Sequence, residues 1–558
     1  MTTRRCFKVN CSLLEKYKNA NYNIEEVIFM EFGNQIKMLR TTFKMSQEEL
    51  ANQLHVSRQA VQKWEAGSAT PDIYTLIEIS KFFGVPIDYL VLNRDGRMMS
   101  DIMNNRQIIK PQYSSIPYWE SYSSNLTEEY RQCIDEGLDI EKYKMLFEAV
   151  STLPKDEIKK KLSDIIFEIV LNAKQRNDYK YIEPSEYNEI QQYKKPYLLA
   201  ERLNKESLKE KVHGAWMGRI CGCMLGKTVE CIKSDELIPF LKETDNYPMH
   251  RYIYKSDINE KICNKYNFPF RDRAYADTIN GMPVDDDTNY TVLAQLIIEK
   301  YGKDFTPLDV SKAWVQYQSK NAYCTAERVA YCNFINGYEP PQSAIYKNPY
   351  REWIGAQIRG DYFGYINPGN PEAAAEMAWR DASISHIKNG IYGEMFVAAM
   401  IAAAAVTADI KKIILSGLAQ IPYTSRLYES VISVLDMYNS GVSRQDCFDK
   451  IHKMYDEHTG YGWCHTISNA MIVAASLLYG NGDYGKSVCM AVETGFDTDC
   501  NGATVGSILG MANGIQGIPE YWTKPINDTL HTSIFGVGTV KISERVDLTM
   551  KQIDALDN

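Results

Sequence analysis

Two runs of glycine at four-residue spacing constrain this chain more than any other feature of its sequence. In GAWMGRICGCMLG the glycines are residues 214, 218, 222 and 226, and in GATVGSILGMANG they are residues 502, 506, 510 and 514. Residues four apart share one face of a helix, and each glycine inside a helix costs about 1 kcal/mol relative to alanine. Close contact between two helix backbones offsets that cost. We therefore expect two helices from opposite ends of a large domain to meet at its centre.

The composition limits the classes of function. The 558 residues suggest two to four domains, and 45% hydrophobic with 24% charged residues is typical of globular proteins. A net charge of −9 excludes a protein that coats nucleic acid by overall basicity. Any DNA contact must then come from a local patch.

Neither a membrane span nor a disulfide framework is indicated. Glycine at this spacing also occurs in membrane helix pairs, but the apolar segment here is short and contains Arg219 and Lys227. No uncharged apolar segment reaches the roughly 18 residues that a span requires, and the first residues contain no long apolar run. The 13 cysteines are scattered, without zinc-finger spacing. We expect a protein of the reducing cytoplasm with no membrane partner.

The chain divides by pattern into four parts, and strand-like alternation is scarce, so we expect an all-α fold. Residues 1–30 form an N-terminal extension, and residues 31–93 contain short capped helices in a helix-turn-helix arrangement. Ile36, Leu39 and Phe43 give one helical apolar period, and Leu76, Ile79, Phe82, Phe83, Val85 and Leu90 supply further core. Residues 94–200 form a linker and helical connector. Residues 201–555 form a large α-helical domain.

Two aspartate-rich turns lie next to helices of the large domain. PVDDDTNY contains Asp285, Asp286 and Asp287, and GFDTDCNGATVGS contains Asp497 and Asp499. If the turns converge, their carboxylates cannot all ionise unaided, and hard divalent cations resolve this repulsion. Oxygen ligands favour two Mg²⁺ ions, with Mn²⁺ as an alternative. Either motif alone is also typical of a solvated turn or a helix N-cap.

The order of these motifs resembles the ADP-ribosylglycohydrolase family. GRICGCMLGKTVE, PVDDDTNYTVLAQL, WRDASISHIKNGIYGE and GFDTDCNGATVGSILG carry the resemblance, which covers residues 201–555. It implies a compact helical bundle with two Mg²⁺ ions in a central cleft. It also implies hydrolysis of the N- or O-glycosidic bond of an ADP-ribosylated protein, nucleic acid or small molecule.

The resemblance also assigns residue roles by position. It places the metal ligands at Asp285, Asp286, Asp287, Asp497 and Asp499, and catalysis at Glu230, Asp286 and Asp499, with Glu230 as the proton-transfer group. It places substrate contacts at His386, Gly355, Arg359, Thr288 and Asn501. Asp381 is a further candidate, and His465 is either a pocket residue or a core histidine.

Three departures from the family pattern bear on activity. Asp285 replaces a hydroxyl ligand and adds negative charge, and Cys500 replaces the last threonine of the second motif. The segment EWIGAQIRGD keeps Gly355 and Arg359 but lacks the family's asparagine. We expect metal binding to survive these changes, whereas the substrate stays open.

The stretch SQEELANQLHVSRQAVQKWEAGSATPD resembles the Cro/repressor-type helix-turn-helix family over residues 31–93. The resemblance places Val61 and Trp64 in the core, and it implies a homodimer on double-stranded DNA. A protein-interaction module with the same helices is the alternative. The residues expected to face DNA are Gln47, Ser57, Arg58, Gln59, Gln62 and Lys63.

Three functions are compatible with this organisation. The first is a metal-dependent hydrolase with a DNA-binding arm. The second is a transcriptional regulator whose large domain senses an ADP-ribose-like nucleotide with little catalysis, which Cys500 and the altered EWIGAQIRGD segment keep open. The third is a structural protein on a retired enzyme fold, and the retained carboxylates count against it.

Overall fold

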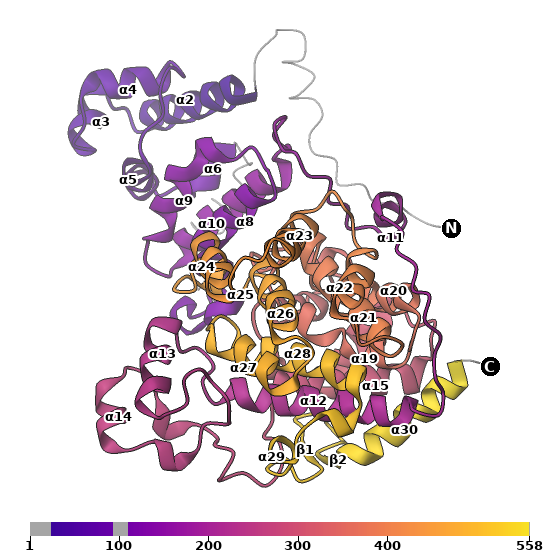
Figure 1. The fold of residues 1–558 in the computed structure, drawn as a ribbon. Coiled ribbons are helices and arrows are strands. Elements are labelled where there is room, and N and C mark those ends of the chain that lie inside the picture. Colours follow the sequence, from indigo (N-terminus) through magenta and orange to yellow (C-terminus); the bar gives the residue numbers. More distant parts are fainter. Residues whose placement is uncertain (1–23, 93–109, 557–558) are drawn as a thin grey trace. The chain divides into compact units, whose positions relative to one another are not determined.

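The computed structural model describes residues 24–92 and 110–556, and these residues are almost entirely helical (Figure 1). Within them, residues 24–130 and 138–174 belong to one compact unit, and residues 131–137 and 175–556 to a second. The all-α prediction is confirmed, and the described part of the chain adds only one small β-hairpin. The connector expected at residues 94–200 is divided between the two units. Most of the N-terminal extension, and residues 93–109 of the linker, lie outside the described residues.

The first unit contains the expected helix-turn-helix arrangement. Ser46 and Glu49 form the capping box that begins α3, and the Ser57 hydroxyl accepts the Ala60 N–H at the start of α4. The helix before them begins at residue 24, inside the expected extension. The helices of this unit, with α8 shared between the units, are α2 (Ile24–Thr42), α3 (Gln47–Gln53), α4 (Arg58–Glu65), α5 (Ile73–Phe83), α6 (Ile87–Leu92), α8 (Leu126–Asp135), α9 (Lys144–Ser151) and α10 (Glu157–Asn172).

The core of the helix-turn-helix helices follows the predicted periodicity with two exceptions. Val61 and Trp64 are buried, as expected. Phe82 is 36% exposed, so its assignment to the core is wrong, and Phe43, at the end of the predicted apolar period, is 51% exposed. The Phe83 ring is instead the buried one, and both exposed rings pack edge-on against it at 5.0 and 5.2 Å between centroids.

The second unit is a bundle of helices built around α12 and α28. The hairpin β1–β2 is antiparallel, with Leu530 opposite Val540. The elements of this unit are α11 (Tyr187–Ile190), α12 (Leu208–Lys227), α13 (Ser234–Glu243), α14 (Glu260–Lys265), α15 (Asp286–Tyr301), α16 (Pro307–Tyr317), α17 (Thr325–Ile335), α18 (Gln342–Ile345), α19 (Asp361–Tyr365), α20 (Pro371–Ala382), α21 (Lys388–Ala404), α22 (Ile410–Leu418), α23 (Arg426–Asn439), α24 (Arg444–Met454), α25 (Gly460–Cys464), α26 (Thr466–Gly480), α27 (Tyr484–Glu493), α28 (Thr498–Asn513), α29 (Glu520–Thr523), β1 (Thr529–His531), β2 (Thr539–Lys541) and α30 (Ile542–Leu556).

The two glycine-rich helices meet as predicted. Gly214, Gly218 and Gly222 of α12 lie against the backbone of Gly510, Gly506 and Gly502 of α28, in that order. A Cβ on any of these six glycines would fall within 3.0 Å of a backbone carbonyl oxygen of the other helix, a separation that Cβ atoms do not tolerate. Backbone contact is therefore the reason for both glycine runs. The two helices are antiparallel, so the end of α12 meets the start of α28.

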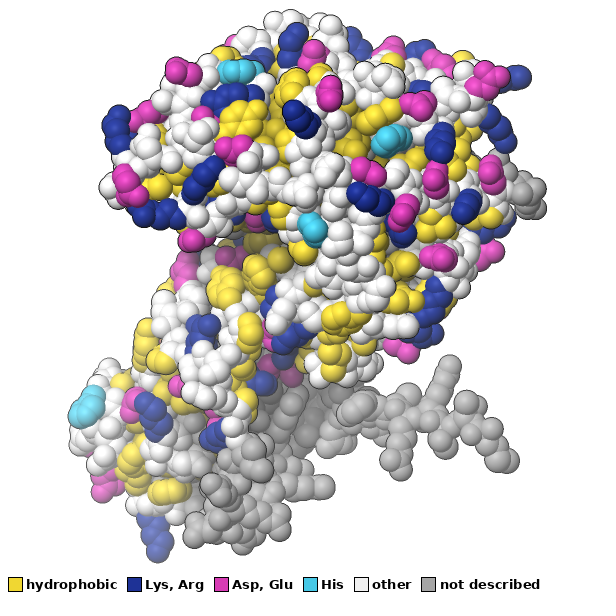
Figure 2. All heavy atoms as spheres, turned by 90° about the horizontal axis from the view of Figure 1, so that it is seen from below, with side chains coloured by type: hydrophobic (Ala, Val, Ile, Leu, Met, Phe, Trp, Pro, Cys, Tyr) yellow, Lys and Arg dark blue, Asp and Glu magenta, His cyan; other side chains and the backbone are white. Residues whose placement is uncertain are grey.

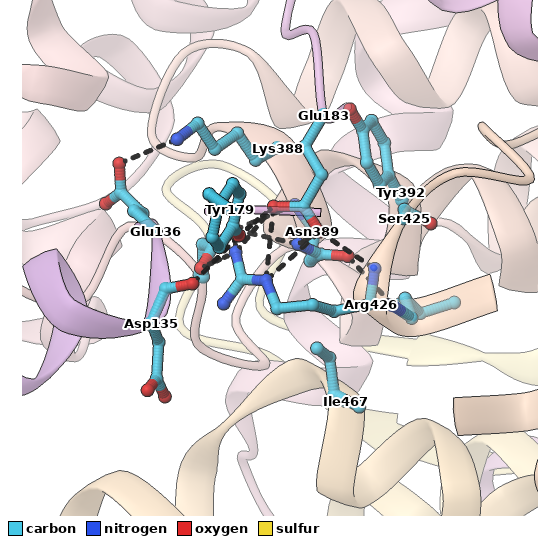
Figure 3. Close-up of polar contacts among 12 residues, drawn as sticks. Asp135, Glu136, Tyr179, Glu183, Lys388, Asn389, Tyr392, Ser425, Arg426 and Ile467 are labelled. Atoms are coloured by element: carbon cyan, nitrogen blue, oxygen red, sulfur yellow. Dashed lines mark hydrogen bonds and ion pairs between the residues drawn. The ribbon is translucent and has the colours of Figure 1, made fainter. Parts of the chain in front are cut away.

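Part of the connector is built into the second unit through buried ion pairs (Figure 3). Arg426 at the start of α23 lies 2.8 Å from Glu183 and 2.7 Å from Glu352. Lys388 lies 3.0 Å from Glu136. The Glu183 and Glu352 side chains are almost completely buried, and a buried ion left without its partner is strongly destabilising. Residues around 136 and 183 are thus part of the fold of this unit.

The surface and the thiols agree with the composition. Acidic and basic side chains are mixed over the face shown in Figure 2. Among the described residues, no helix combines the length and apolar character needed to cross a membrane. The cysteines within the described part of the chain are free thiols, and many of them are buried.

Candidate metal centre and DNA-binding surface

The aspartate-rich turns converge at the junction of α12 and α28. The Thr498 hydroxyl donates to the carbonyl of Gly226, the last glycine of the first run, at 2.9 Å. This contact places the start of α28 over the end of α12. Carboxylate oxygens of Asp287 and Asp499 lie within 4.8 Å of each other and of the Cys500 sulfur. Side chains that are distant in sequence therefore share one site, as expected.

Asp285 and Asp287 are held by basic residues of α12. Asp285 caps α15 by accepting the Asp287 N–H at 3.0 Å, and its other oxygen lies 2.6 Å from the Lys227 ammonium. Arg219, which is 1% exposed, lies 3.1 Å from Asp287 and 2.8 Å from Asp361. Lys227 compensates the negative charge that Asp285 adds to the family pattern.

Asp497 and Asp499 lie at the start of α28. Asp497 accepts a hydrogen bond from the Cys464 thiol at 3.5 Å. Asp499 is 3% exposed, and within the described part of the chain no group donates a hydrogen bond to its Oδ1. Burial, together with the charges of Glu230 and Asp497, raises the pKa of Asp499 well above its usual value. A buried carboxylate oxygen without a donor is costly, and a bound cation removes that cost.

Glu230 and Asp286 form the partly exposed edge of the carboxylate group. Burial raises the pKa of Asp286 to about 8, with added repulsion from Asp285 and Glu230. Burial likewise raises the pKa of Glu230, helped by the charges of Asp285 and Asp497. The nearest basic partner of Glu230 is Arg273, 3.8 Å away. Burial thus favours the protonated form of both carboxylates when no cation is bound.

The donor set fits divalent cations. The carboxylates counted here are seven: Asp285, Asp286, Asp287, Asp361, Asp497, Asp499 and Glu230. Three basic side chains, Arg219, Lys227 and Arg273, contact four of them. The excess of four negative charges equals the charge of two divalent cations. Carboxylate oxygens are the ligands that Mg²⁺ and Mn²⁺ prefer, and the orphaned Asp499 oxygen provides one free ligand atom.

A strained turn leads into α28, and it is held by residues for which the sequence indicated no such role. Phe496 has φ +59°, which is uncommon for a bulky residue. Its N–H donates to Glu457, which is 3% exposed and also accepts the Ser234 N–H at 3.0 Å. Trp463 donates to the Phe496 carbonyl, and Asn469 accepts the Asp497 N–H at 3.3 Å. The glycine before Phe496 was the available sequence signal for this turn.

The predicted substrate residues lie in the buried interior of the same unit. The Arg359 guanidinium pairs with Asp381 and Glu327, and the Glu327 carboxylate occupies the space where a side chain at Gly355 would be. His386 is completely buried, its Nδ1 shares a hydrogen bond with Ser385, and burial lowers its pKa. Their substrate role stays a prediction, and the contacts of Arg359 also make it part of a buried charge cluster.

Three further predicted residues have local hydrogen-bond roles. Thr288 donates to the Asp285 carbonyl at 3.2 Å, and Asn501 donates to Asn469 at 2.8 Å. His465 accepts the Ile467 N–H and caps α26. Burial lowers the pKa of His465 to about 4, which favours the core-histidine interpretation.

The predicted DNA-facing residues lie on α4 and at the start of α3. The Gln47 amide donates to Glu65 at 2.8 Å, and Glu65 also pairs with Arg40, so Gln47 is held in place. Ser57 acts as the N-cap of α4. The exposed side chains of this helix are Arg58, Gln59, Gln62 and Lys63.

Two family models match the chain, one over each part. The family model for ADP-ribosylglycohydrolase matches residues 204–550, and that for a helix-turn-helix matches residues 36–90. A solved chain of an ADP-ribosylglycohydrolase-related protein complex is 16% identical, with a TM-score of 0.41, over 62% of this chain and 99% of that chain.

Curated relatives match a short part of the sequence. The chain is 41% identical over 87 residues to the HTH-type transcriptional activator BcrR of Enterococcus faecalis, which is 16% of this chain and 42% of BcrR. It is 31% identical over 86 residues to the SPbeta prophage-derived uncharacterized HTH-type transcriptional regulator YonR of Bacillus subtilis (strain 168), which is 15% of this chain and 80% of YonR. Since the first family model spans more than half of the sequence, the chain belongs to the ADP-ribosylglycohydrolase family and carries a helix-turn-helix domain ahead of that part.

Proposed function

We propose that the protein is a hydrolase, dependent on two Mg²⁺ or Mn²⁺ ions, that cleaves the glycosidic bond of ADP-ribosylated protein, nucleic acid or small molecules. The observation that carries the proposal is the gathering of Asp287 and Asp499, with an unsatisfied Asp499 oxygen, where two glycine-rich helices meet. A structural protein has no use for a buried excess of negative charge. That cost is justified where the charge binds cations.

The residues that would hold the cations are the five aspartates of the two turns. Bound there, the cations supply positive charge that orients ribose hydroxyls and activates a water molecule. Arg219 pairs with Asp287, and Lys227 pairs with Asp285. This second layer of contacts holds the ligand carboxylates in one orientation.

The substrate approaches from the exposed edge of the site. Glu230 and Asp286 are the carboxylates that solvent reaches, so the scissile bond lies against them. Glu230 transfers the proton at the glycosidic bond, and burial raises its pKa, which is the direction that suits a proton donor. Positive charge develops on the sugar as the bond breaks, and the neighbouring carboxylates stabilise it.

The helix-turn-helix domain directs the protein to double-stranded DNA. Arg58, Gln59, Gln62 and Lys63 present two basic and two amide side chains on one exposed helix. Amide and guanidinium groups read base edges in the major groove, and lysine contacts phosphate. A single domain of this kind binds weakly, so we propose that the protein acts as a homodimer in the cytoplasm.

Release of free ADP-ribose tests the hydrolase proposal. Full-length protein is incubated with ADP-ribosylated protein, ADP-ribosylated nucleic acid and free ADP-ribosyl nucleotides, with Mg²⁺ or with excess EDTA. Asp286→Ala and Asp499→Ala should abolish release, and Asp272→Ala, at an exposed site on the same unit, should not. Full turnover by either of the first two variants in EDTA would refute the proposal. Tight binding without turnover would favour the sensor instead.

A further inference from the structure

Two cysteine side chains stand among the carboxylates of the proposed metal centre. Cys500 Sγ lies 3.2 Å from Asp287 Oδ2 and within 4.8 Å of a carboxylate oxygen of Asp499. Cys223 Sγ lies within 4.8 Å of carboxylate oxygens of Asp285 and Asp287. The two thiols come from α28 and α12, which pack together through their glycines.

The environment of Cys500 differs from that of an ordinary buried thiol. Buried cysteines behave as small hydrophobic residues, and the thiol of Cys221, on the same helix as Cys223, donates to the Trp522 carbonyl. Cys500 instead points its sulfur at a carboxylate that is itself fully buried. Its sulfur therefore contacts a candidate metal ligand.

The spacing of the donor atoms suits one cation. Metal–sulfur bonds are about 2.3 Å long and metal–oxygen bonds about 2.0–2.2 Å, so two ligands of one ion lie roughly 3 to 4.5 Å apart. The Cys500–Asp287 separation is inside that range, and Asp499, which is 3% exposed with an unsatisfied Oδ1, belongs to the same group. A cation bound here takes the place of the thiol proton, which is released to solvent.

We propose that Cys500 is a thiolate ligand of one of the two cations, and that this position selects a borderline metal such as Mn²⁺, Fe²⁺, Co²⁺ or Zn²⁺ over Mg²⁺. The inference rests on the proposed metal centre. Thiolate is a soft ligand that Mg²⁺ does not favour, and affinity for the other ions rises along the Irving–Williams series. The second position, with oxygen ligands alone, remains suited to Mg²⁺.

Cobalt absorption spectroscopy tests the inference without measuring activity. Metal-free full-length protein is titrated with Co²⁺, and the ligand-field bands in the visible region report all bound Co²⁺. A thiolate-to-cobalt charge-transfer band in the near ultraviolet reports bonding to sulfur alone. The variants are Cys500→Thr, which restores the family's hydroxyl, Cys223→Ala, and Cys221→Ser as a matched control on α12.

We expect the charge-transfer band in the unaltered protein and in Cys221→Ser, and its loss in Cys500→Thr while the ligand-field bands persist. The preference for Mn²⁺ over Mg²⁺, measured by competition, should fall at least about tenfold in Cys500→Thr. Ligand-field bands without any charge-transfer band would overturn this inference and leave the proposed metal centre standing. A charge-transfer band that survives Cys500→Thr but not Cys223→Ala would overturn the assignment to Cys500. Failure of Co²⁺ and Mg²⁺ to bind at all would overturn the metal centre itself.

Discussion

Replacing Gly222 by alanine tests the helix contact on which the candidate site depends. The new Cβ would lie 2.0 Å from the Gly502 carbonyl oxygen, about 1.4 Å closer than the 3.4 Å at which ordinary contact begins. The obstacle is backbone, so no side-chain rotation relieves it. The helices must separate, and the start of α28 moves with them.

The magnitude follows from two opposing effects. Overpacking of a well-packed core costs about 1–3 kcal/mol, and a backbone obstacle places this site at the upper end. Alanine recovers about 1 kcal/mol of helix propensity. We expect a net loss of about 2 kcal/mol, which lowers the Tm by a few degrees.

Thermal melts of the full chain, followed by circular dichroism, measure this effect against Gly485→Ala. Gly485 lies in α27, where a Cβ would meet only side-chain atoms at 3.3 Å and beyond, so that variant should melt as the unaltered protein does or slightly higher. The double variant with Gly502→Ala should lose less than the sum of the single losses, because the first alanine already separates the helices. A Tm of Gly222→Ala equal to that of Gly485→Ala would refute the backbone contact.

Further predictions address the cations, the buried charges and DNA. Asp499→Asn should stabilise the metal-free protein, because burial is the main cause of the raised pKa of the Asp499 carboxyl. The same variant should gain less than the roughly 2.7 kcal/mol that Mg²⁺ at a hundredfold excess over Kd adds to the stability of the unaltered protein. Equal stabilisation by Mg²⁺ in thermal melts of the two proteins would contradict this. Burial raises the pKa of Glu327 to about 7, so the folded state binds more protons than the unfolded state between pH 4.5 and 7, and stability falls as pH rises through that window. Glu327→Gln should therefore gain stability relative to the unaltered protein from pH 5 to pH 7.5 in urea titrations, and a constant difference would refute this assignment. Glu457→Gln should weaken Mn²⁺ binding about tenfold in calorimetry, because it releases the turn before α28. An unchanged affinity would show that this turn does not depend on Glu457. Lys63→Ala should lower the salt dependence of binding to double-stranded DNA by about one unit of slope, because its ammonium is proposed to contact phosphate. Anisotropy at several salt concentrations measures this slope, and a slope equal to that of the unaltered protein would contradict the contact.

Repeated spacing made the centre of the large domain predictable. The glycine runs specify one helix face each, and a face that lacks side chains can only be filled by another backbone. Because Asp499 begins one of these helices and Glu230 follows the other, their meeting was implied once the helices were paired. The capping box at Ser46 was equally predictable, since both partners lie within four residues.

Contacts without local periodicity were not predictable. The pairing of Lys227 with Asp285 depends on where the start of α15 crosses the end of α12, and neither residue carries a pattern that indicates the other. Glu457 reaches the turn at Phe496 from a different segment. The exposure of Phe82 beside a buried Phe83 also lacked a signal, because two adjacent phenylalanines fit the apolar period almost equally well.

The ion pairs of the connector limit where the chain can be cut between its two domains. The family model begins at residue 204, yet Arg426 depends on Glu183, and Lys388 on Glu136, which both precede that position. A fragment that begins at residue 204 would leave Arg426 without Glu183 and Lys388 without Glu136. The two parts therefore cannot be exchanged at residue 204: a replacement of the helix-turn-helix domain has to keep the sequence from about residue 131 together with the ADP-ribosylglycohydrolase-family domain.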